Sequence, residues 1–496
     1  MTAAYATLET RFKRLGLVNE AVAMLNWDSA AMMPDGAASA RAEQLAELKV
    51  IAHEILADPR LADLMDDAGR DGLDDWQRAN LTEMRRLWLH ATAVPADLVA
   101  AYSRACSECE MAWRKARPAN DFAVILPRLQ RVLDLTREVA AAKAAKLGVT
   151  PYEALLDQFE PGGRVAEIDR LFDHLAERLP VLIDGALAAQ AARQPPLRPT
   201  GPFPIEAQRR AGRQMMTRLG FEFDHGRLDQ SLHPFCGGTP DDVRITTRYD
   251  EADFARALMG VLHETGHALY ERGLPAAWRR QPVGEARGMS IHESQSLLIE
   301  MQVCRSREFL EFAAPILREC FGGTGPEWEA ANLYRLGTRV ARSLIRVDAD
   351  EVTYPAHVIL RYRLERALIS SELNLADLPD AWSEGMERLL AVTPPDDRDG
   401  CLQDIHWYDG AWGYFPTYTL GAMTAAQLFD AAKRAVPAIP GAIARGDFAP
   451  LLAWLRANVH GLGSRYSARD ILLRATGKPL DAAIFEGHLR ARYLAA

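Results

Sequence analysis

Residues 249–273 read YDEADFARALMGVLHETGHALYERG, and this stretch decides how the rest of the chain is interpreted. It opens with acidic residues suited to an N-cap and first helical turn and ends on a glycine, which predicts one helix of about six turns. Within it lies His263-Glu264-Thr265-Gly266-His267. Because residues four apart share one helical face, both imidazoles can point at a single ion.

This HExxH pattern is typical of zinc hydrolases. A zinc ion with three protein ligands keeps its last position for water and lowers the pKa of that water from about 15.7 toward about 7. Glu264 lies beside the first histidine and can take the proton, so we expect it to be the general base. The alternative is two ordinary histidines on a surface or core helix. Gly266 favours the metal site, since a glycine inside a helix suggests close approach of another group.

The third metal ligand is less clear from spacing. An Asp or Glu on a following helix commonly supplies it when no third histidine lies close downstream. The segment Ser290–Ser296 leads into an apolar helical pattern that would turn Glu293 toward the first helix, which favours Glu293. Spacing alone does not choose among the glutamates within reach, which are Glu271, Glu285, Glu293 and Glu300.

The remaining sequence predicts a mostly α protein. Residues 7–192 are rich in Ala, Leu, Glu and Arg with apolar spacings of three and four, which indicates a run of helices. Six prolines and glycines cluster in residues 195–204, and we expect a subdomain boundary there. Residues 221–249 predict a small β element. Helices then return, with a loop-rich stretch at 393–419, and we interpret residues 410–429 as loop and pocket wall.

Composition excludes several classes of protein. The 496 residues include 48% hydrophobic and 25% charged residues, as in a folded globular protein, and carry a formal charge of −9. This acidic balance argues against nucleic acids and anionic membranes as partners. The six cysteines are few and scattered, and residues 1–18 hold no apolar signal core. We therefore expect a cytoplasmic protein.

At this point the sequence resembles a known family, the carboxypeptidase Taq metallocarboxypeptidases. The resemblance covers nearly the whole chain, and its motifs follow in the family's order. They are Trp27-Asp28, Met33-Pro34, Gly36-Ala37, Leu155-Leu156-Asp157, Glu160-Pro161-Gly162, His233-Pro234-Phe235, Asp242–Thr246, the HExxH, His292–Ser296, Ile345-Arg346, Ala349-Asp350, Gly400, Gln403-Asp404 and His406-Trp407.

The resemblance implies a large, mostly helical gluzincin fold with a deep groove, similar to neurolysin and angiotensin-converting enzyme, and a small β-sheet beside the HExxH helix. Residues 1–496 would form one peptidase unit, usually a homodimer, with a helical subdomain at 1–200 and a catalytic subdomain at 201–496. The implied activity is release of single residues from peptide C-termini. By the family's pattern His263, His267 and Glu293 bind the metal, and Glu264 is the catalytic base.

A carboxypeptidase needs a cation for the terminal carboxylate of its substrate, and an arginine provides a bidentate one. Arg346 is our first candidate. The alternative is that Arg346 forms an ion pair with Asp348 or Asp350 in the same segment.

Further residues are expected to stabilise charge that develops on the substrate carbonyl. His406 and Tyr418 resemble the His and Tyr that hydrogen bond this oxygen in related gluzincins. Tyr414 or Tyr408 could replace Tyr418, and packing in an aromatic loop is the competing interpretation for all three tyrosines.

Three other positions are candidates to bind substrate or to support the site. Asp242–Thr246 is predicted to be a strand, and in related folds an edge strand beside the metal helix pairs with the substrate backbone. Arg244 then binds substrate or is structural. His233 is expected at the closed end of the groove, with packing as an equal alternative. Glu300 is a candidate to orient a ligating histidine.

The leading hypothesis is thus a zinc carboxypeptidase acting on peptides with a free C-terminus. Co²⁺ or Mn²⁺ could replace Zn²⁺, because His₂Glu sites accept several divalent ions. A dipeptidyl carboxypeptidase or an oligopeptidase on the same scaffold is one alternative. A non-catalytic helical binding protein with a structural HExxH is another.

Overall fold

A computed structural model of the chain describes residues 3–70 and 72–494. The first part is helical, as the apolar spacing predicts, and the next segment, residues 192–204, contains no regular element. The N-terminal helices are α1 (Ala3–Ala31), α2 (Ala38–Leu56), α3 (Arg60–Ala68), α4 (Asp75–Thr92), α5 (Ala96–Ala119), α6 (Phe122–Leu147), α7 (Pro151–Leu156) and α8 (Val165–Ala191).

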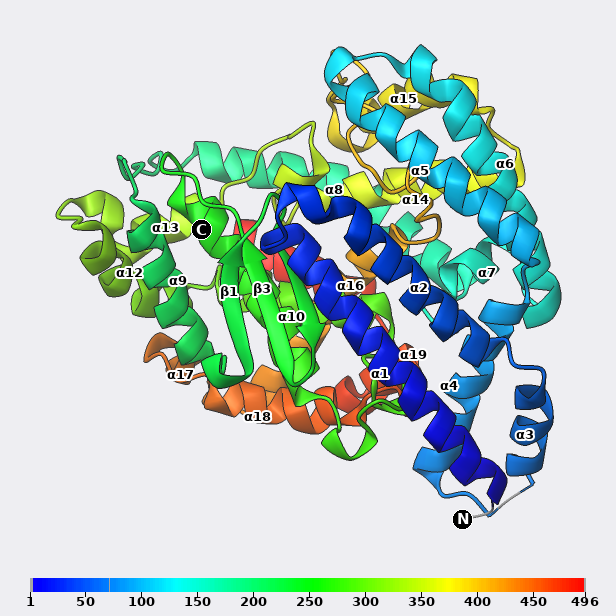
Figure 1. Ribbon diagram of the computed structural model, residues 1–496. Coiled ribbons are helices and arrows are strands. Elements are labelled where there is room, and N and C mark those ends of the chain that lie inside the picture. Colours follow the sequence, from blue (N-terminus) through cyan, green and yellow to red (C-terminus); the bar gives the residue numbers. More distant parts are fainter. Residues whose placement is uncertain (1–2, 71, 495–496) are drawn as a thin grey trace.

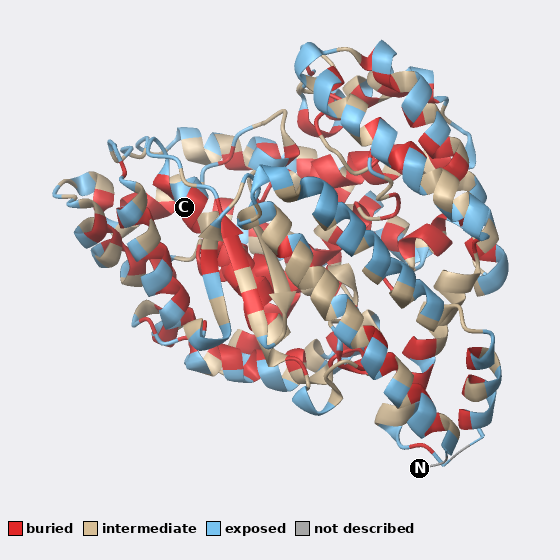
Figure 2. Cartoon of the chain, in the orientation of Figure 1, coloured by how far each residue is buried: buried red, intermediate tan, exposed pale blue. Residues whose placement is uncertain are grey.

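Helices α1 and α2 form an outer layer across the molecule (Figure 1). The α2 helix buries none of its residues, and its ribbon is largely exposed or intermediate in Figure 2. By contrast α1 packs with α3 and α4 through a separate apolar cluster that includes Tyr5, Leu8 and Phe12. It also contacts strand β2, so this outer layer is attached to the small sheet.

The β element is a three-stranded sheet of β1 (Gly226–Gln230), β2 (Phe235–Thr239) and β3 (Asp242–Thr247) in the order β1-β3-β2. β3 pairs with β1 in parallel and with β2 antiparallel. The alternation in the sequence correctly predicts the strand, but the expectation that it is an edge strand is wrong. β3 is central because both neighbours bond to it, so β1 and β2 form the edges.

The second part of the chain returns to helices. Buried side chains of β3, Val243 and Ile245, pack with Val261 and Ala268 of the HExxH helix, which places the sheet directly on that helix. The helices are α9 (Ile205–Leu219), α10 (Phe254–Gly273), α11 (Gly288–Leu297), α12 (Arg307–Phe321), α13 (Ala330–Gly337), α14 (Tyr354–Ser370), α15 (Leu378–Leu390), α16 (Pro416–Ala435), α17 (Ile439–Ala444), α18 (Ala449–Asn458), α19 (Ala468–Thr476) and α20 (Ala482–Leu489).

One prediction fails near the end of the loop-rich stretch. Residues 410–429 were expected to be loop, yet α16 begins at Pro416 and is buried along most of its length. Proline breaks a helix in its interior, but at the first helical turn its missing N–H would be unpaired anyway and its fixed φ suits the helix. The proline therefore marks the start of this helix.

A continuous hydrophobic core contains buried residues from Ala105 to Tyr493 and so draws on both sides of residue 200. Buried residues concentrate on β3 and the central helices (Figure 2). Within the described residues, no helix combines the length and apolar character needed to span a lipid bilayer. The division at residue 200 remains a prediction.

Candidate active site

Helix α10 presents the two histidines. Asp253 caps it by accepting hydrogen bonds from the backbone N–H groups of Ala255 and Arg256, and Gly273 is its last residue, as the sequence predicts. The rings of His263 and His267 lie on the same face with centroids 5.0 Å apart. The local sequence thus fixes the spacing of the pair.

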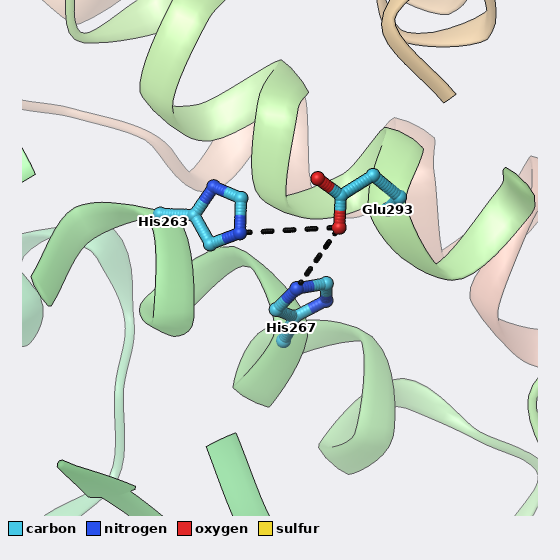
Figure 3. Close-up of side chains that lie close together, drawn as sticks. All are labelled: His263, His267 and Glu293. Carbon is cyan, nitrogen blue, oxygen red and sulfur yellow. Dashed lines mark ion pairs between the residues drawn. The ribbon is translucent and has the colours of Figure 1, made fainter. Parts of the chain in front are cut away.

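Helix α11 brings Glu293 to the two histidines (Figure 3). Its Oε2 lies 3.9 Å from Nε2 of His263 and 3.5 Å from Nε2 of His267. The three ligand atoms lie within 4.8 Å of one another, and within the described residues this is the one His/Cys/Asp/Glu group of that kind. The structure therefore brings together the three residues predicted to bind metal.

The separations suit a small divalent ion. Two ligand atoms at about 2.0–2.1 Å from a tetrahedral zinc ion lie about 3.4 Å apart. The observed separations approach this value, and 3.9 Å is too long for a direct hydrogen bond. The cluster of the half-buried His263 with the buried His267 and Glu293 supplies the nitrogen and oxygen donors that such ions prefer.

Two glycines allow the helices to approach closely behind this cluster. A Cβ on Gly266 would lie 2.5 Å from the carbonyl oxygen of Gln295, so only glycine lets α11 pack against α10 here. A Cβ on Gly421 of α16 would lie 2.9 Å from Cβ of Glu293. The expectation that Gly266 permits a close approach is confirmed, and the approaching group is the α11 backbone.

Glu300 supports the first histidine. Its Oε2 lies 3.0 Å from Nδ1 of His263, and its Oε1 accepts a 2.8 Å hydrogen bond from Arg305. Burial alone would raise the pKa of Glu300, but the His263 hydrogen bond and the Arg305 charge outweigh it and lower this pKa. An ionised Glu300 fixes the His263 ring with its Nε2 lone pair toward the cluster. Glu300 lies in a π-helical turn, Leu298–Val303, which the sequence pattern did not reveal.

Glu264 is buried beside these ligands. Burial raises its pKa to about 7; the His263 charge opposes this rise, and the Glu293 charge adds to it. The backbone of Cys236, in strand β2, hydrogen bonds to Glu264. A carboxylate with a pKa near neutrality is suited to accept and return a proton.

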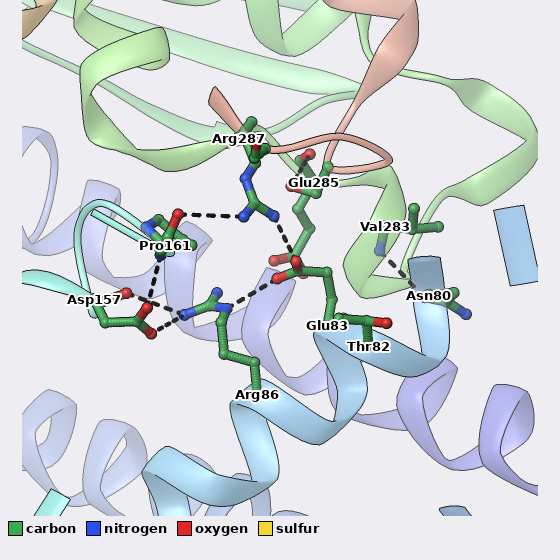
Figure 4. A network of polar contacts seen from close by, with 12 residues as sticks. Asn80, Thr82, Glu83, Arg86, Asp157, Pro161, Val283, Glu285 and Arg287 are labelled. Carbon is green, nitrogen blue, oxygen red and sulfur yellow. Dashed lines mark hydrogen bonds and ion pairs between the residues drawn. The ribbon is translucent and has the colours of Figure 1, made fainter. Parts of the chain in front are cut away.

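The other two glutamates considered as third ligand lie outside the cluster. Glu271 is 2.8 Å from Nε2 of His292, whose ring stacks on His267 at 4.5 Å between centroids. Glu285 belongs to a polar region near Glu83 and Arg287 (Figure 4).

A second wall faces the cluster, formed by a loop and the start of α16. His406 Nε2 lies 3.1 Å from the hydroxyl of Tyr418. Arg346 lies beneath the Tyr418 ring, 4.8 Å from its centroid, and donates two hydrogen bonds to Oδ1 of Asp404. Arg361, which is fully buried, binds the other oxygen of Asp404 at 2.5 Å. Arg346 is thus paired with Asp404, and neither Asp348 nor Asp350 is its partner.

Burial and the two arginines set the protonation states of Asp404, His406 and Tyr418 on this wall. Burial opposes ionisation of Asp404, but Arg346 and Arg361 hold its pKa well below the usual range. Burial lowers the pKa of His406 to about 4, so the ring is neutral at pH 7. Burial raises the pKa of Tyr418 to about 12; the Arg346 charge opposes this rise and the Glu293 charge adds to it.

The three candidate tyrosines separate clearly. Tyr408 is fully buried and donates its hydroxyl to the carbonyl oxygen of Cys401, so it points away from the cluster. Tyr414 lies beside Tyr418 with ring centroids 5.1 Å apart. Sequence reasoning missed Tyr354, whose pKa burial and the Glu293 charge raise well above the ordinary value. No spacing rule would have linked Tyr354 to Glu293.

Two candidate substrate-binding residues lie farther out. His233 is exposed in the bend before β2, and a Cβ on Gly260, about one turn before His263, would lie 3.9 Å from the ring of the next residue, Pro234. Arg244 forms a 2.7 Å ion pair with Asp242, and its guanidinium lies 4.2 Å from the Trp27 ring centroid. Through that contact Arg244 attaches α1 to the sheet.

The helical fold, the HExxH helix and the clustered glutamate define a metallopeptidase. The model of the carboxypeptidase Taq (M32) metallopeptidase family matches residues 7–493, and the chain belongs to this family. It is 40% identical over 486 residues to thermostable carboxypeptidase 1 of Thermus thermophilus, which covers 95% of each chain. It is 34% identical to carboxypeptidase 1 of Bacillus subtilis, covering 97% of this chain and 96% of that one.

Solved structures of carboxypeptidases share the fold of this chain. Trypanosoma cruzi metallocarboxypeptidase 1 superposes with a TM-score of 0.97 at 39% identity, covering 99% of each chain. An M32 carboxypeptidase from Deinococcus radiodurans gives 0.93 at 36% identity, with 99% of each chain covered. The family, fold class and activity expected from the sequence are therefore confirmed: the protein is a metal-dependent carboxypeptidase that releases amino acids from peptide C-termini.

Proposed function

We propose that His263, His267 and Glu293 bind the divalent metal, that this metal is zinc, with cobalt or manganese as substitutes, and that Glu264 is the catalytic base. The observation that carries the proposal is the convergence of the three ligand atoms within 4.8 Å beside a buried Glu264. When bound, the ion lowers the pKa of a water molecule from about 15.7 toward about 7 and polarises a carbonyl group.

The chain's own residues then move the proton. A carboxylate oxygen of Glu264 accepts it from the attacking water and returns it to the nitrogen of the departing amino acid. A pKa near 7 serves both steps, because a base that is too weak accepts poorly and one that is too strong donates poorly. Glu300 keeps His263 in the tautomer whose Nε2 is free to bind the ion.

The opposite wall stabilises charge on the substrate oxygen. Neutral His406 donates its Nε2–H to the Tyr418 oxygen, and the Tyr418 hydroxyl, protonated at neutral pH, is left to donate to the substrate carbonyl. Tyr414 packs beside this hydroxyl and is the alternative donor.

Arg346 binds the terminal carboxylate of the peptide in this proposal. Its Nε and Nη2 are held by Asp404, and within residues 3–70 and 72–494 its Nη1 has no hydrogen-bond partner. A guanidinium fixed on one side and open on the other presents a rigid donor to a substrate anion. His233 and Arg244 are proposed to act farther along the groove, His233 on the substrate and Arg244 through the position of α1.

Products from a defined peptide test this function. We expect successive loss of single residues from a peptide with a free C-terminus and no hydrolysis of the same peptide with a C-terminal amide, measured by mass spectrometry over time. Release of dipeptides, or unchanged cleavage after amidation, would show that the groove does not anchor the terminal carboxylate as proposed.

Three further proposals concern the location, the oligomeric state and the subdomains of the protein. We propose a cytoplasmic location, supported by six cysteines that are all free thiols. The resemblance to the family supports a homodimer, which light scattering of the purified protein tests. The subdivision into residues 1–200 and 201–496 is supported by the irregular segment that separates α8 from α9, and limited proteolysis there tests it.

A further inference from the structure

A cavity of about 600 Å³ lies between the end of α8, the proline-rich segment, the end of α13 and the C-terminal turn, Arg490–Leu494. We call it the α8–α13 pocket; in Figure 1 these elements lie in the same part of the molecule. Its charge is one-sided, because no Asp or Glu is among its described lining residues. The cations are Arg193, Arg198, Arg335, Arg339 and Arg492, of which Arg492 forms a 3.0 Å ion pair with Glu351.

Several of these arginines remain available for a ligand. Arg198 and Arg339 are exposed, and the described part of the chain gives neither an ion-pair partner. The Nε of Arg335 is buried without a hydrogen-bond partner, and its Nη2 makes a 3.4 Å contact with Asn332. A buried guanidinium without an anionic partner is unfavourable, so an anion in the pocket would compensate the charge of Arg335.

The walls are held in place by paired amide contacts. Gln190 of α8 both donates to and accepts from the backbone of Val340, at 3.1 and 2.9 Å. Asn332 of α13 does the same with the backbone of Leu197, at 2.8 Å in each direction. The pocket is therefore formed before any ligand arrives, which reduces the entropic cost of binding.

The remaining lining combines an apolar wall with the polar residues Gln190, Gln194, Thr338 and Tyr493. Leu187, Pro195, Pro196, Leu336 and Val340 line it alongside the arginines. A small pocket with an apolar wall and a few converging charges is typical of ligand sites. The matching ligand carries a phosphate or carboxylate on an apolar body.

One chain of contacts leads from this pocket to the metal cluster. Arg305 donates to the carbonyl oxygen of Gly337, at the end of α13, and to Glu300, at 3.0 and 2.8 Å. Glu300 holds Nδ1 of His263. On the pocket floor, Arg492 donates to the carbonyl oxygens of Met301 and Gln302, in the π-helical turn that carries Glu300.

We propose that the α8–α13 pocket binds a small organic anion, and that the bound anion stabilises the metal centre through Gly337, Arg305 and Glu300. The second half rests on the proposed role of His263 as a metal ligand, whereas the first half does not. Coupling of this kind requires only that the anion favours the arrangement in which Arg305 holds Glu300.

Calorimetric titration at constant ionic strength tests the binding. Phenyl phosphate and benzoate carry the two anionic groups on an apolar body, and phenol is the neutral control. Apart from any anion that Arg346 binds in the active site, we expect the metal-loaded enzyme to bind one anion per chain, and we expect the double variant Arg335→Ala with Arg339→Ala to bind this anion at least about tenfold more weakly. The matched double variant Arg70→Ala with Arg85→Ala removes two exposed arginines elsewhere and should bind like wild type.

The coupling has its own measurement. We expect saturating anion to slow the loss of metal to a chelator by about fivefold or more, and we expect Arg305→Gln to bind the anion but lose this effect. Absence of anion binding, or equal binding by the Arg335 and Arg339 double variant, would overturn the site. Binding that leaves metal loss unchanged would overturn the coupling, and neither result would alter the case for Glu264.

Discussion

The two walls of the active site differ in how the chain builds them and in the charge they carry. One wall, which we call the metal wall, comes from α10, α11 and the π-helical turn that follows α11, and it is rich in carboxylates, namely Glu264, Glu293 and Glu300. The opposite wall comes from separate segments, with Arg346 and Asp404 lying 58 residues apart, and two buried arginines share one aspartate there. The acidic wall is therefore suited to a cation, and the other wall is suited to the anionic end of a peptide.

The base on the metal wall should give the largest effect. Replacing Glu264→Gln removes the proposed proton acceptor but none of the proposed ligands, so we expect kcat to fall by about 10²–10⁴-fold while metal content stays at the wild-type level. Steady-state kinetics and elemental analysis of the same sample measure both. Glu251→Gln, an exposed change just before α10, is the control. Substantial activity in Glu264→Gln would assign the base to another residue.

On the opposite wall, Asp404→Asn leaves two buried arginines without their shared anion. We expect a loss of about 3–5 kcal/mol in the free energy of unfolding at pH 7, measured with urea. The pKa of Asp404 is lowered in the folded state. Its contribution to the free energy of unfolding is therefore fully present above the unfolded-state pKa of about 3.9, and it is lost as the pH falls from there toward the folded-state pKa.

The free energies of unfolding of wild type and Asp404→Asn should therefore become more similar as the pH falls below about 3.9. Asp430→Asn breaks an exposed pair with Arg434 and should cost about 0–1 kcal/mol at most. If the difference in the free energy of unfolding between wild type and Asp404→Asn is the same at pH 7 and pH 2, Asp404 is not held ionised by its arginines.

Arg346→Ala tests the anion-binding role of the same wall. We expect kcat/KM on a free C-terminal peptide to fall by the equivalent of about 2–5 kcal/mol, because a charged partner of the substrate is lost. Arg256→Ala, which removes an exposed arginine paired with Asp348, should leave kcat/KM unchanged. If both variants retain wild-type values, the carboxylate is bound elsewhere.

Tyr418→Phe removes the hydroxyl proposed to donate to the substrate oxygen. We expect kcat to fall by about 10²–10³-fold with little change in KM, since the bond strengthens in the transition state. Tyr408→Phe makes the same change at a buried tyrosine whose hydroxyl binds Cys401, and should leave kcat near wild type. A loss of activity in Tyr414→Phe alone would transfer the role to Tyr414.

The smallest expected effect is at the support of the metal wall. Glu300→Gln weakens the orientation of His263 without removing a ligand, and we expect metal affinity to fall by about 10–100-fold. Competition with a chelator measures this affinity. Glu311→Gln, an exposed change on the following helix, is the control. Equal metal affinities for the two variants would show that Glu300 does not support metal binding.

The sequence predicts the metal wall well because its information is local. The i, i+4 spacing of His263 and His267 fixes their shared face, and the acidic start and glycine end of the stretch define α10. Glu293 emerged from the apolar pattern after it. The π-helical turn around Glu300 has no comparable signal, since a single wider turn leaves no periodic trace in the sequence.

The opposite wall was harder to predict, because its contacts are long-range. Nothing near Arg346 in the sequence identifies Asp404, and the nearby Asp348 and Asp350 were misleading candidates for a partner. Residues 410–429 were expected to be loop, and so the helix that carries Tyr418 was missed, although a proline in the first turn of a helix, as Pro416 is, is favourable. Tertiary packing decides both features.

Reconstitution with metal tests the central claim most directly. The chelated protein should leave a peptide with a free C-terminus intact, and adding zinc should restore stepwise release of single residues, reaching a plateau at one ion per chain; chelated Glu293→Ala should recover little at that ratio. Stepwise release by metal-free protein, or full recovery by Glu293→Ala at one ion per chain, would contradict the assignment of His263, His267 and Glu293 as the metal centre.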